Sequence, residues 1–360
     1  MSLFLIYPER KMIMKTGILI PAYQPDGKMM EFVRECAEAG FEVTVVNDGS
    51  SRGLEYFEQV KLIPGVTLIG YEQNRGKGYA LKTGIRSMEE RGFGGVITAD
   101  ADGQHLVEDI KKVSAAMAEN PGKLIMGARD TDKMPPRSQG GNRLTRRVFK
   151  LLYGIDLQDT QTGLRGIPLT DHSREGLLAI RGDRYEYEME MLTRSASLFP
   201  AGIFEQPIST VYFDGNKGSH FRPVKDSARI FAVILRRFPA FMASSLLAFG
   251  IDYSLFNLFF YVLSLGTAGS TVCARLVSAS ANFLVNKYAV FHAGSDSSYS
   301  LARYAALAAF ILCANIALMH LLTDILGMPA YLMKILVESL MYILSFVLQN
   351  KWSAGKKAAA

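Results

Sequence analysis

The strongest constraint on the fold is a change in composition near residue 235. Before Arg236 the chain mixes charged and apolar residues, whereas after Arg237 it consists mostly of Ala, Leu, Phe, Ile, Val and Ser. The second part contains four apolar stretches, at residues 240–264, 267–291, 302–325 and 330–348. A helix rises about 1.5 Å per residue, so each stretch is long enough to cross the core of a bilayer. The sequence therefore predicts four transmembrane helices after a water-exposed domain.

Basic residues around these stretches indicate an orientation in the membrane. The short connections near Gly266 and at 327–329 carry no charge. The opposite ends of the stretches carry Arg236, Arg237, Lys287, Arg303, Lys351, Lys356 and Lys357. Because Lys and Arg are enriched in cytoplasmic loops, we expect both termini and the first domain on the cytoplasmic side of the plasma membrane.

Composition argues against two other classes of protein. The net charge is +6, yet the basic residues form no long run and flank apolar segments instead, which suits a membrane surface or a phosphorylated substrate better than nucleic acid. The cysteines Cys36, Cys273 and Cys313 are too far apart for a CxxC metal site. We therefore expect reduced cysteines and no nucleic-acid partner.

Strand and helix patterns alternate in the first domain. Short runs rich in β-branched residues occur at 16–23, 41–50, 66–71, 95–99 and 124–128, and helical patterns occur between them at 27–39, 79–91 and 106–119. A crossover helix between successive strands is typical of parallel pairing. The sequence therefore predicts a doubly wound, Rossmann-like α/β sheet.

Polar clusters occupy the carboxyl ends of three of these strands, at residues 21–23, 47–51 and 100–105. In open α/β sheets, ligands bind outside the carboxyl ends of the strands. An aspartate after a strand is more often a turn or helix-capping residue than a ligand. Three clusters on one edge favour a binding site.

The segment ITADADGQH, at 97–105, is the best candidate for a metal site. Asp100, Asp102 and Gln104 place carboxylate and amide oxygens close together, and Mg²⁺ and Mn²⁺ accept such ligands. A bound ion of this kind can stabilise a departing diphosphate. A turn before a helix at Leu106 would explain the same residues.

The segment NRGKG, at 74–78, offers glycine backbone and two cations just before a predicted helix. Such a segment suits an anionic ligand group. The spacing of a Walker A motif is absent, and no G-x-G-x-x-G follows the first strand. These absences argue against a simple ATPase and a Rossmann dehydrogenase.

Seven motifs occur in a fixed order: IPAYQP, VVNDGSS, NRGKGYALKTG, TADADGQH, GARD, DTQTGLRG and YEYEMEML. In this order the chain resembles glycosyltransferase family 2 over residues 15–230, and more closely its polyprenyl-phosphate sugar synthases of the dolichyl-phosphate mannose synthase type. Two positions depart from the family pattern, since Asn47 and Pro25 stand where acidic residues are common. The resemblance implies a GT-A fold and an inverting sugar transfer.

The resemblance also implies roles for individual residues. The nucleotide sugar is expected to contact Pro21, Tyr23, Asp48, Lys77 and Asp100. A divalent cation, Mg²⁺ or Mn²⁺, is expected at Asp100, Asp102 and Gln104. The acceptor phosphate is expected at Arg129 and Arg143, and the reacting sugar beside Asp159, Gln161 and Arg165. Glu188 is a further catalytic candidate, although glutamates at its spacing from Glu186 and Glu190 are usually exposed.

Charge favours a phosphate as the acceptor. A hydroxyl acceptor needs a base to take its proton, whereas a lipid phosphate is already anionic and needs cations to hold it. We assign Arg222 and Lys225 to the acceptor phosphate for this reason. For the basic residues Arg146, Arg147 and Lys150, a solvated basic surface is an equally good explanation.

The apolar part of the chain resembles the GtrA-like four-helix membrane family over residues 238–352. The resemblance rests on SASANFLVNKYAVF at 278–291 and SFVLQNKW at 345–352. The predicted organisation is an N-terminal extension at 1–14, a GT-A domain at 15–222, a juxtamembrane amphipathic helix at 223–238, a membrane domain at 239–352 and a basic tail at 353–360. Short polar faces on the membrane helices leave room for a homo-oligomer.

Taken together, the sequence predicts a membrane-anchored transferase. It would move a sugar from a UDP- or GDP-linked donor to polyprenyl phosphate at the cytoplasmic leaflet, giving a polyprenyl-phosphate monosaccharide for cell-envelope glycosylation. The alternative is a transporter that flips lipid-linked sugars and whose first domain only binds nucleotide sugar.

Overall fold

The computed structural model describes residues 15–134, 136–209, 222–292 and 299–353. The chain forms two compact units, residues 1–146 with 157–230 and residues 147–156 with 231–360. Two of the three boundaries fall within α5 (Pro136–Tyr153) and α9 (Pro223–Ile234), and the third follows α5. The predicted N-terminal extension, and the basic tail apart from its first residue, lie outside the described residues.

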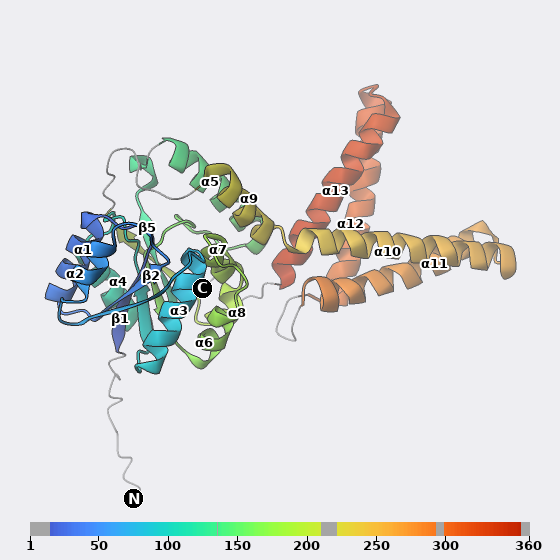
Figure 1. Cartoon of the computed structure of the whole chain (residues 1–360). Helices are drawn as coiled ribbons and strands as arrows, with labels where there is room; N and C mark the ends of the chain where they lie inside the picture. The colour runs from blue at the N-terminus through green and yellow to red at the C-terminus, as the bar shows by residue number, and fades with distance from the viewer. Residues whose placement is uncertain (1–14, 135, 210–221, 293–298, 354–360) are drawn as a thin grey trace, which may run out of the picture. The chain divides into compact units, whose positions relative to one another are not determined.

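A mixed sheet of seven strands forms the core of the first unit (Figure 1). The strand order is β3-β2-β1-β4-β6-β5-β7. The strands are β1 (Thr16–Ala22), β2 (Val43–Asp48), β3 (Val66–Tyr71), β4 (Gly95–Thr98), β5 (Leu124–Arg129), β6 (Arg165–Pro168) and β7 (Ile203–Ile208). The parallel pairing of β1 with β2 and β4, and of β2 with β3, agrees with the predicted α/β alternation.

Strands β6 and β7 were not predicted. β6 has the sequence RGIP and β7 the sequence IFEQPI, so each contains a proline and neither has a run of β-branched residues. β6 runs antiparallel to both β4 and β5, whereas β7 is parallel to β5. The sheet is therefore mixed.

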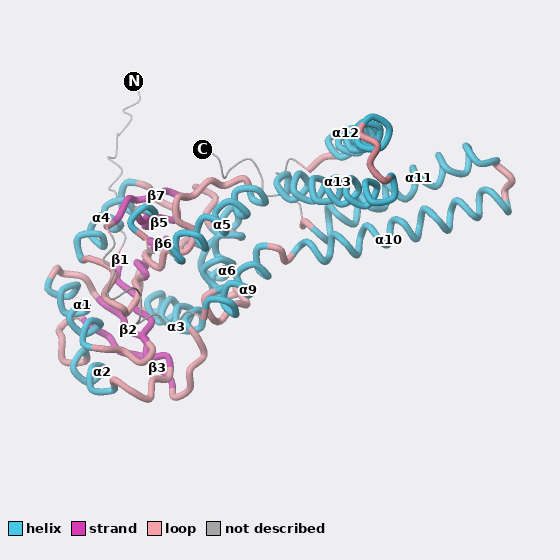
Figure 2. The backbone as a smooth tube through the Cα atoms, turned by 90° about the horizontal axis from the view of Figure 1, so that it is seen from above, coloured by secondary structure: helices cyan, strands magenta, loops and turns pink. Residues whose placement is uncertain are grey.

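Helices cover both faces of this sheet (Figure 2). Alternate residues of β1 point to opposite faces. Ile18 and Ile20 join a core cluster with side chains of α1 (Gly27–Glu38), α2 (Leu54–Val60) and α4 (Val107–Glu119). Leu19 points the other way, toward α3 (Lys77–Glu90), where a Cβ on Gly84 would lie only 2.8 Å from its Cδ2. The remaining short helices are α6 (Asp171–Leu178), α7 (Glu186–Thr193) and α8 (Ser195–Leu198).

The direction of β6 positions the functional edge of the sheet. Thr98, the last residue of β4, is paired with Arg165, the first residue of β6. The chain leaving β4 and the chain entering β6 therefore lie at the same edge. As a result, the segment before β6 lies beside Asp100.

Four long helices make up most of the second unit, and each predicted apolar stretch folds as a helix (Figure 1). They are α10 (Arg237–Asn257), α11 (Gly266–Val285), α12 (Leu301–Met319) and α13 (Ala330–Ser353). The first three continue into the π-helical segments Leu258–Val262, Asn286–Val290 and His320–Ile325. Within the described residues, Arg237–Val262 and Leu301–Thr323 are long and apolar enough to cross a membrane. That all four helices do so stays a prediction.

Polar groups connect helices within the second unit. Ser244 Oγ donates to Asn286 Oδ1 at 2.6 Å, and Asn286 Nδ2 donates to Gln349 Oε1 at 3.2 Å. The hydroxyl of Tyr299 also donates to Gln349 Oε1. These four side chains are buried, so the hydrogen bonds avoid the cost of unsatisfied polar groups.

Candidate active site

A cavity of about 430 Å³ lies at the carboxyl edge of the sheet in the first unit. Residues that follow three strands line it, among them Tyr23 after β1, Asp48 at the end of β2 and Asp100 after β4. Gly76 and Lys77, at the start of α3, line it as well. The volume lies within the range of about 300–1,000 Å³ that is usual for small-molecule sites. The polar clusters after separate strands thus surround one cavity.

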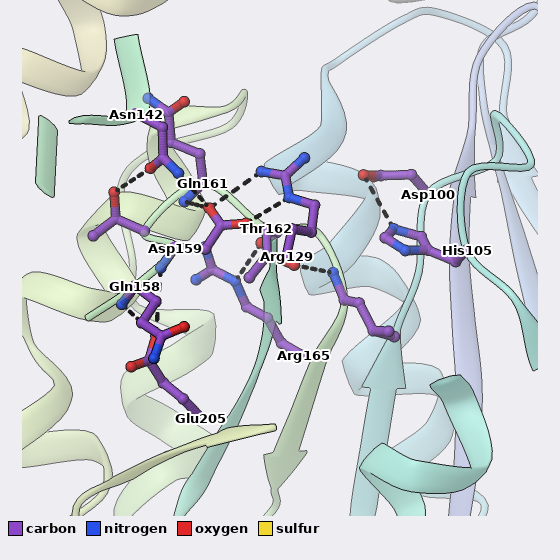
Figure 3. A network of polar contacts seen from close by, with 12 residues as sticks. Asp100, His105, Arg129, Asn142, Gln158, Asp159, Gln161, Thr162, Arg165 and Glu205 are labelled. Atoms are coloured by element: carbon purple, nitrogen blue, oxygen red, sulfur yellow. Dashed lines mark hydrogen bonds and ion pairs between the residues drawn. The ribbon is translucent and has the colours of Figure 1, made fainter. Parts of the chain in front are cut away.

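Lys77 is the centre of a network of charges in this cavity. Its Nζ lies 2.6 Å from Asp100 Oδ1 and 3.0 Å from Glu188 Oε2. On the other side of Asp100, His105 Nε2 lies 3.7 Å from Oδ2 (Figure 3), which is too long for a hydrogen bond. Three separate elements, α3, the loop after β4 and α7, therefore supply the network.

These contacts shift the pKa values of the charged groups. Burial opposes the charge of Lys77, but the carboxylates of Asp100 and Glu188 outweigh it and raise the pKa of the ammonium. Burial also opposes the charge of Asp100, yet Lys77 and His105 hold its pKa well below the usual range. The pKa of Asp102 is raised, first by burial and then by the negative charge of Asp100.

Asp100 and Asp102 suit a divalent cation. Both line the cavity, and the negative charge of Asp100 adds to burial in raising the pKa of Asp102, so a cation there would offset repulsion between the two carboxylates. Mg²⁺ is commonly held by one or two carboxylates, with substrate phosphates and water completing its shell. The described residues contain no group of three or more His, Cys, Asp or Glu side chains arranged for a metal ion. The residues therefore fit an ion held partly by the ligand.

Gln104 contacts the predicted metal site through its backbone. Its backbone N–H donates to Asp102 Oδ1 at 3.1 Å and so orients that carboxylate. The side chain of Gln104 is not among the described residues that line the cavity. That the Gln104 side chain holds the cation stays a prediction.

Asp48 organises the loop that begins α3. Its two carboxylate oxygens accept hydrogen bonds from the Tyr71 hydroxyl at 2.7 Å, the Asn74 amide at 2.9 Å, and the backbone N–H groups of Arg75 at 2.8 Å and Gly76 at 2.9 Å. A carboxylate has about four acceptor sites, so these donors use most of its capacity. Asp48 therefore shapes one side of the cavity through the backbone at 74–76.

The glycines of NRGKG permit close packing. Gly76 has a φ of 105°, which disfavours other residues, and a Cβ on it would lie 2.5 Å from the carbonyl oxygen of Asp183. A Cβ on Gly78 would lie 2.5 Å from Cβ of Tyr187. The glycines thus let the segment around residues 183–187 approach the start of α3, which brings Glu188 to Lys77.

Asp159, in the segment before β6, forms several hydrogen bonds that fix this segment (Figure 3). Asp159 is fully buried and accepts hydrogen bonds from the Arg129 guanidinium, from Asn142 Nδ2 at 3.2 Å and from the backbone N–H of Gln161 at 2.9 Å. Gln158 comes just before Asp159, and its backbone N–H donates a hydrogen bond to Glu205 of β7 at 2.6 Å. These contacts bind two predicted site residues, Asp159 and Arg129, to each other.

Arg165 is enclosed in the protein. Only 1% of it is exposed, its Nε donates to the carbonyl of Thr162 at 3.0 Å, and its Nη1 donates to the carbonyl of Glu188 at 2.7 Å. Burial lowers the pKa of its guanidinium. Arg165 therefore positions the start of α7, and it is not among the described residues that line the cavity.

Further basic side chains line the cavity: Lys28, Arg184, Arg222, Lys225 and Arg229. Arg222 and Lys225 are exposed. Asp226 forms an ion pair with Arg229 at 3.3 Å and accepts the backbone N–H of Arg222 at 2.7 Å, which fixes the start of α9. Arg143, by contrast, is exposed on α5 and is not among the described lining residues.

Some lining residues were missed in the sequence. Arg184, Tyr185 and Arg229 line the cavity, but no strand end or motif spacing marks Arg184 and Arg229. Tyr185 is the first residue of the YEYEMEML motif, so the motif could have indicated that Tyr185 belongs to the site. Burial raises the pKa of the Tyr185 phenol to about 12.

The sheet, its helices and the carboxylates at its edge define a GT-A type glycosyltransferase. Residues 17–171 match glycosyl transferase family 2, and residues 240–354 match the GtrA/DPMS transmembrane domain. The chain therefore combines a domain of glycosyl transferase family 2 with a GtrA/DPMS transmembrane domain, and it is a membrane protein.

Named relatives and a solved structure are similar to part of this chain. The UDP-N-acetylglucosamine–dolichyl-phosphate N-acetylglucosaminyltransferase of Methanococcus voltae is 29% identical over 219 residues, covering 54% of this chain and 85% of the relative. The undecaprenyl-phosphate mannosyltransferase of Micrococcus luteus is 26% identical over 180 residues, covering 47% and 72%. The glucosyl-3-phosphoglycerate synthase structure from Mycobacterium tuberculosis is 16% identical with a TM-score of 0.48, covering 62% and 79%.

Proposed function

We propose that this enzyme transfers a sugar from a UDP- or GDP-linked donor to the phosphate of a polyprenol at the cytoplasmic leaflet. The product would be a polyprenyl-phosphate monosaccharide for cell-envelope glycosylation. The observation that carries the proposal is the composition of the cavity wall. The carboxylates of Asp100 and Asp102 line the same cavity as several Lys and Arg side chains. The relatives named for dolichyl-phosphate and undecaprenyl-phosphate transfer support a lipid phosphate as the acceptor.

The donor would bind along the strand ends. Pro21 and Tyr23 offer apolar and aromatic surface to the nucleoside, while Lys77 and the start of α3 suit the diphosphate. Asp100 and Asp102 would hold Mg²⁺ or Mn²⁺, which when bound would stabilise the charge on the departing diphosphate. Asp48 would act on the donor through the loop that it orders.

The acceptor would be held by cations. A phosphate monoester is anionic at neutral pH, so no base is needed to remove a proton before attack. Arg222 and Lys225, with Arg229, would bind this phosphate and align one of its oxygens with the anomeric carbon. That oxygen would form the new C–O bond as the bond to the diphosphate breaks, which inverts the anomeric carbon and releases UDP or GDP.

The membrane domain would keep the enzyme at its lipid substrate. We place the four helices α10 to α13 across the bilayer, with the catalytic domain and both termini in the cytoplasm. The amphipathic α9, with Val224 exposed beside Lys225, would lie along the headgroups.

The test is product formation from radiolabelled UDP-glucose, UDP-galactose, UDP-N-acetylglucosamine and GDP-mannose with undecaprenyl phosphate and Mg²⁺ or Mn²⁺. Label in the lipid phase that disappears in Asp102→Ala supports the reaction and the role of Asp102. Absence of labelled lipid with every donor, combined with movement of lipid-linked sugar across liposomes, would instead support the transporter.

A further inference from the structure

The ammonium of Lys77 lies against the carboxylate that the proposed cation would use. Lys77 Nζ is 2.6 Å from Asp100 Oδ1. The same ammonium lies 3.0 Å from Glu188 Oε2, and only 14% of the lysine side chain is exposed. Lys77 is therefore already the counter-charge of two carboxylates, the buried Glu188 and the partly exposed Asp100.

Glu188, which lies beside this ammonium, has a carboxylate oxygen that can still accept a hydrogen bond. It is 8% exposed, and its second oxygen, Oε1, is buried without a hydrogen-bond partner among the described residues. A buried carboxylate oxygen without a donor is costly, so the ion pair with Lys77 is the contact that makes the charge of Glu188 tolerable. Removing Lys77 would leave both Asp100 and Glu188 without their ammonium partner.

A divalent ion and this ammonium compete for Asp100. Mg²⁺ binds carboxylate oxygens at about 2.0–2.1 Å, so an ion on Asp100 would lie within a few ångströms of Lys77 Nζ. Two like charges at that distance repel strongly in a partly buried site. A nucleotide diphosphate removes the conflict because its negative charges can receive both the ammonium and the divalent ion.

From these contacts we propose that Lys77 is an internal counter-cation that keeps the divalent ion from binding tightly until a nucleotide diphosphate arrives. The inference rests on the proposed function, because it assumes that the cavity binds a nucleotide diphosphate and a metal ion. Cation and nucleotide then bind with positive coupling, and each raises the affinity of the other by the same factor. Lys77 is a positioning residue that determines this coupling.

The experiment measures Mn²⁺ binding to the full-length protein in detergent by electron paramagnetic resonance, without nucleotide and with saturating UDP or GDP. In the native protein we expect nucleotide to tighten Mn²⁺ binding by about tenfold or more, within the usual range of coupling between sites. In Lys77→Met we expect tighter Mn²⁺ binding without nucleotide, by about tenfold, and a much smaller effect of nucleotide.

Two further variants complete the test. Lys82→Met is the matched control, since Lys82 is on the same helix and pairs with Asp183 at 2.6 Å, outside the described lining of the cavity. It should bind Mn²⁺ as the native protein does. Lys77→Arg keeps the charge and should retain weak Mn²⁺ binding without nucleotide, which separates loss of charge from misfolding.

The outcomes separate this inference from the proposed function. Equal or weaker Mn²⁺ binding by folded Lys77→Met, while the native protein makes glycosylated lipid, overturns the inference alone. Failure of the native protein to bind Mn²⁺ even with UDP and GDP, together with no glycosylated lipid, overturns the proposed function and the inference with it.

Discussion

Gly163 lies directly against the carboxylate of Asp100, because a Cβ built on this glycine would come within 2.7 Å of Asp100 Cγ. The contact joins the segment before β6 to the residues after β4, and the carbonyl of Gly163 also accepts a hydrogen bond from Thr98 at 2.8 Å. The position of Asp100 therefore depends on a residue without a side chain.

Gly163→Ala should displace Asp100 and disable the enzyme. Because a misplacement of about 1 Å at a reacting centre can cost about 100-fold in rate, we expect a loss of that order in sugar transfer. Gly140→Ala, on α5, meets no atom within 4 Å and is the matched control. Radiolabel transfer and thermal unfolding are measured for both variants. Equal activity of the two would show that the contact does not position Asp100.

Asp48→Asn should destabilise the loop at 74–76. An asparagine turns one acceptor oxygen into an amide donor, which would face the N–H groups of Arg75 or Gly76. We expect a loss of about 1–3 kcal/mol in the free energy of unfolding and weaker binding of UDP or GDP. The measurements are denaturant unfolding and isothermal titration calorimetry.

Asn47→Asp is the natural comparison, because an acidic residue is common at this position in the family. Asn47 Oδ1 accepts the backbone N–H of Ser50 at 2.9 Å, and an aspartate oxygen can accept it too. We expect little change in stability. If the two variants behaved alike, the hydrogen bonds of Asp48 would not be what holds the loop.

Cys36 should be inert in the folded protein. It is fully buried, and burial, followed by the charge of Glu35, raises the pKa of its thiol from 9.0 to about 12. The stability gained by keeping the thiol neutral is complete below pH 9 and is lost as the pH rises toward 12. In a Cys273→Ala/Cys313→Ala background, we expect iodoacetamide to modify Cys36 at pH 9 only after denaturant unfolds the protein. Rapid modification of the folded protein at pH 9 would contradict this burial.

Gln349→Leu should weaken the membrane unit. The change leaves the Asn286 amide and the Tyr299 hydroxyl without their acceptor, which costs about 1–3 kcal/mol per buried group. Trp352 is the only tryptophan of the chain and packs against Tyr299 with ring centroids 6.1 Å apart, so its fluorescence reports on this unit. The expected result is a lower unfolding midpoint in detergent.

The double variant tests whether these residues act as one network. Adding Asn286→Leu to Gln349→Leu should cost less than the sum of the two single changes, because residues of one network are not additive. Ser280→Ala, an exposed position on α11, should leave the midpoint nearly unchanged. Additive effects would show that the side chains contribute independently.

The amino-acid sequence by itself determined the division of the chain, the α/β alternation and the edge of the sheet that carries the site. These properties depend on local patterns, since apolar length indicates membrane helices and the carboxyl ends of parallel strands meet at one edge. Asp100 and Asp102 could be singled out because their neighbours in sequence are also their neighbours in space. Tyr23 and Asp48 could be singled out in the same way, because both lie near the carboxyl ends of predicted strands.

Only the tertiary structure decided which distant groups face each other. Because β6 is antiparallel to β4, Gly163 lies beside Asp100. Asp159 forms an ion pair with Arg129. The close packing that Gly76 and Gly78 allow places Glu188 beside Lys77. Strand direction follows from how the whole sheet packs, and β6 is too short to reveal it. Electrostatic partners depend on distances of a few ångströms, which the packing of the complete domain sets.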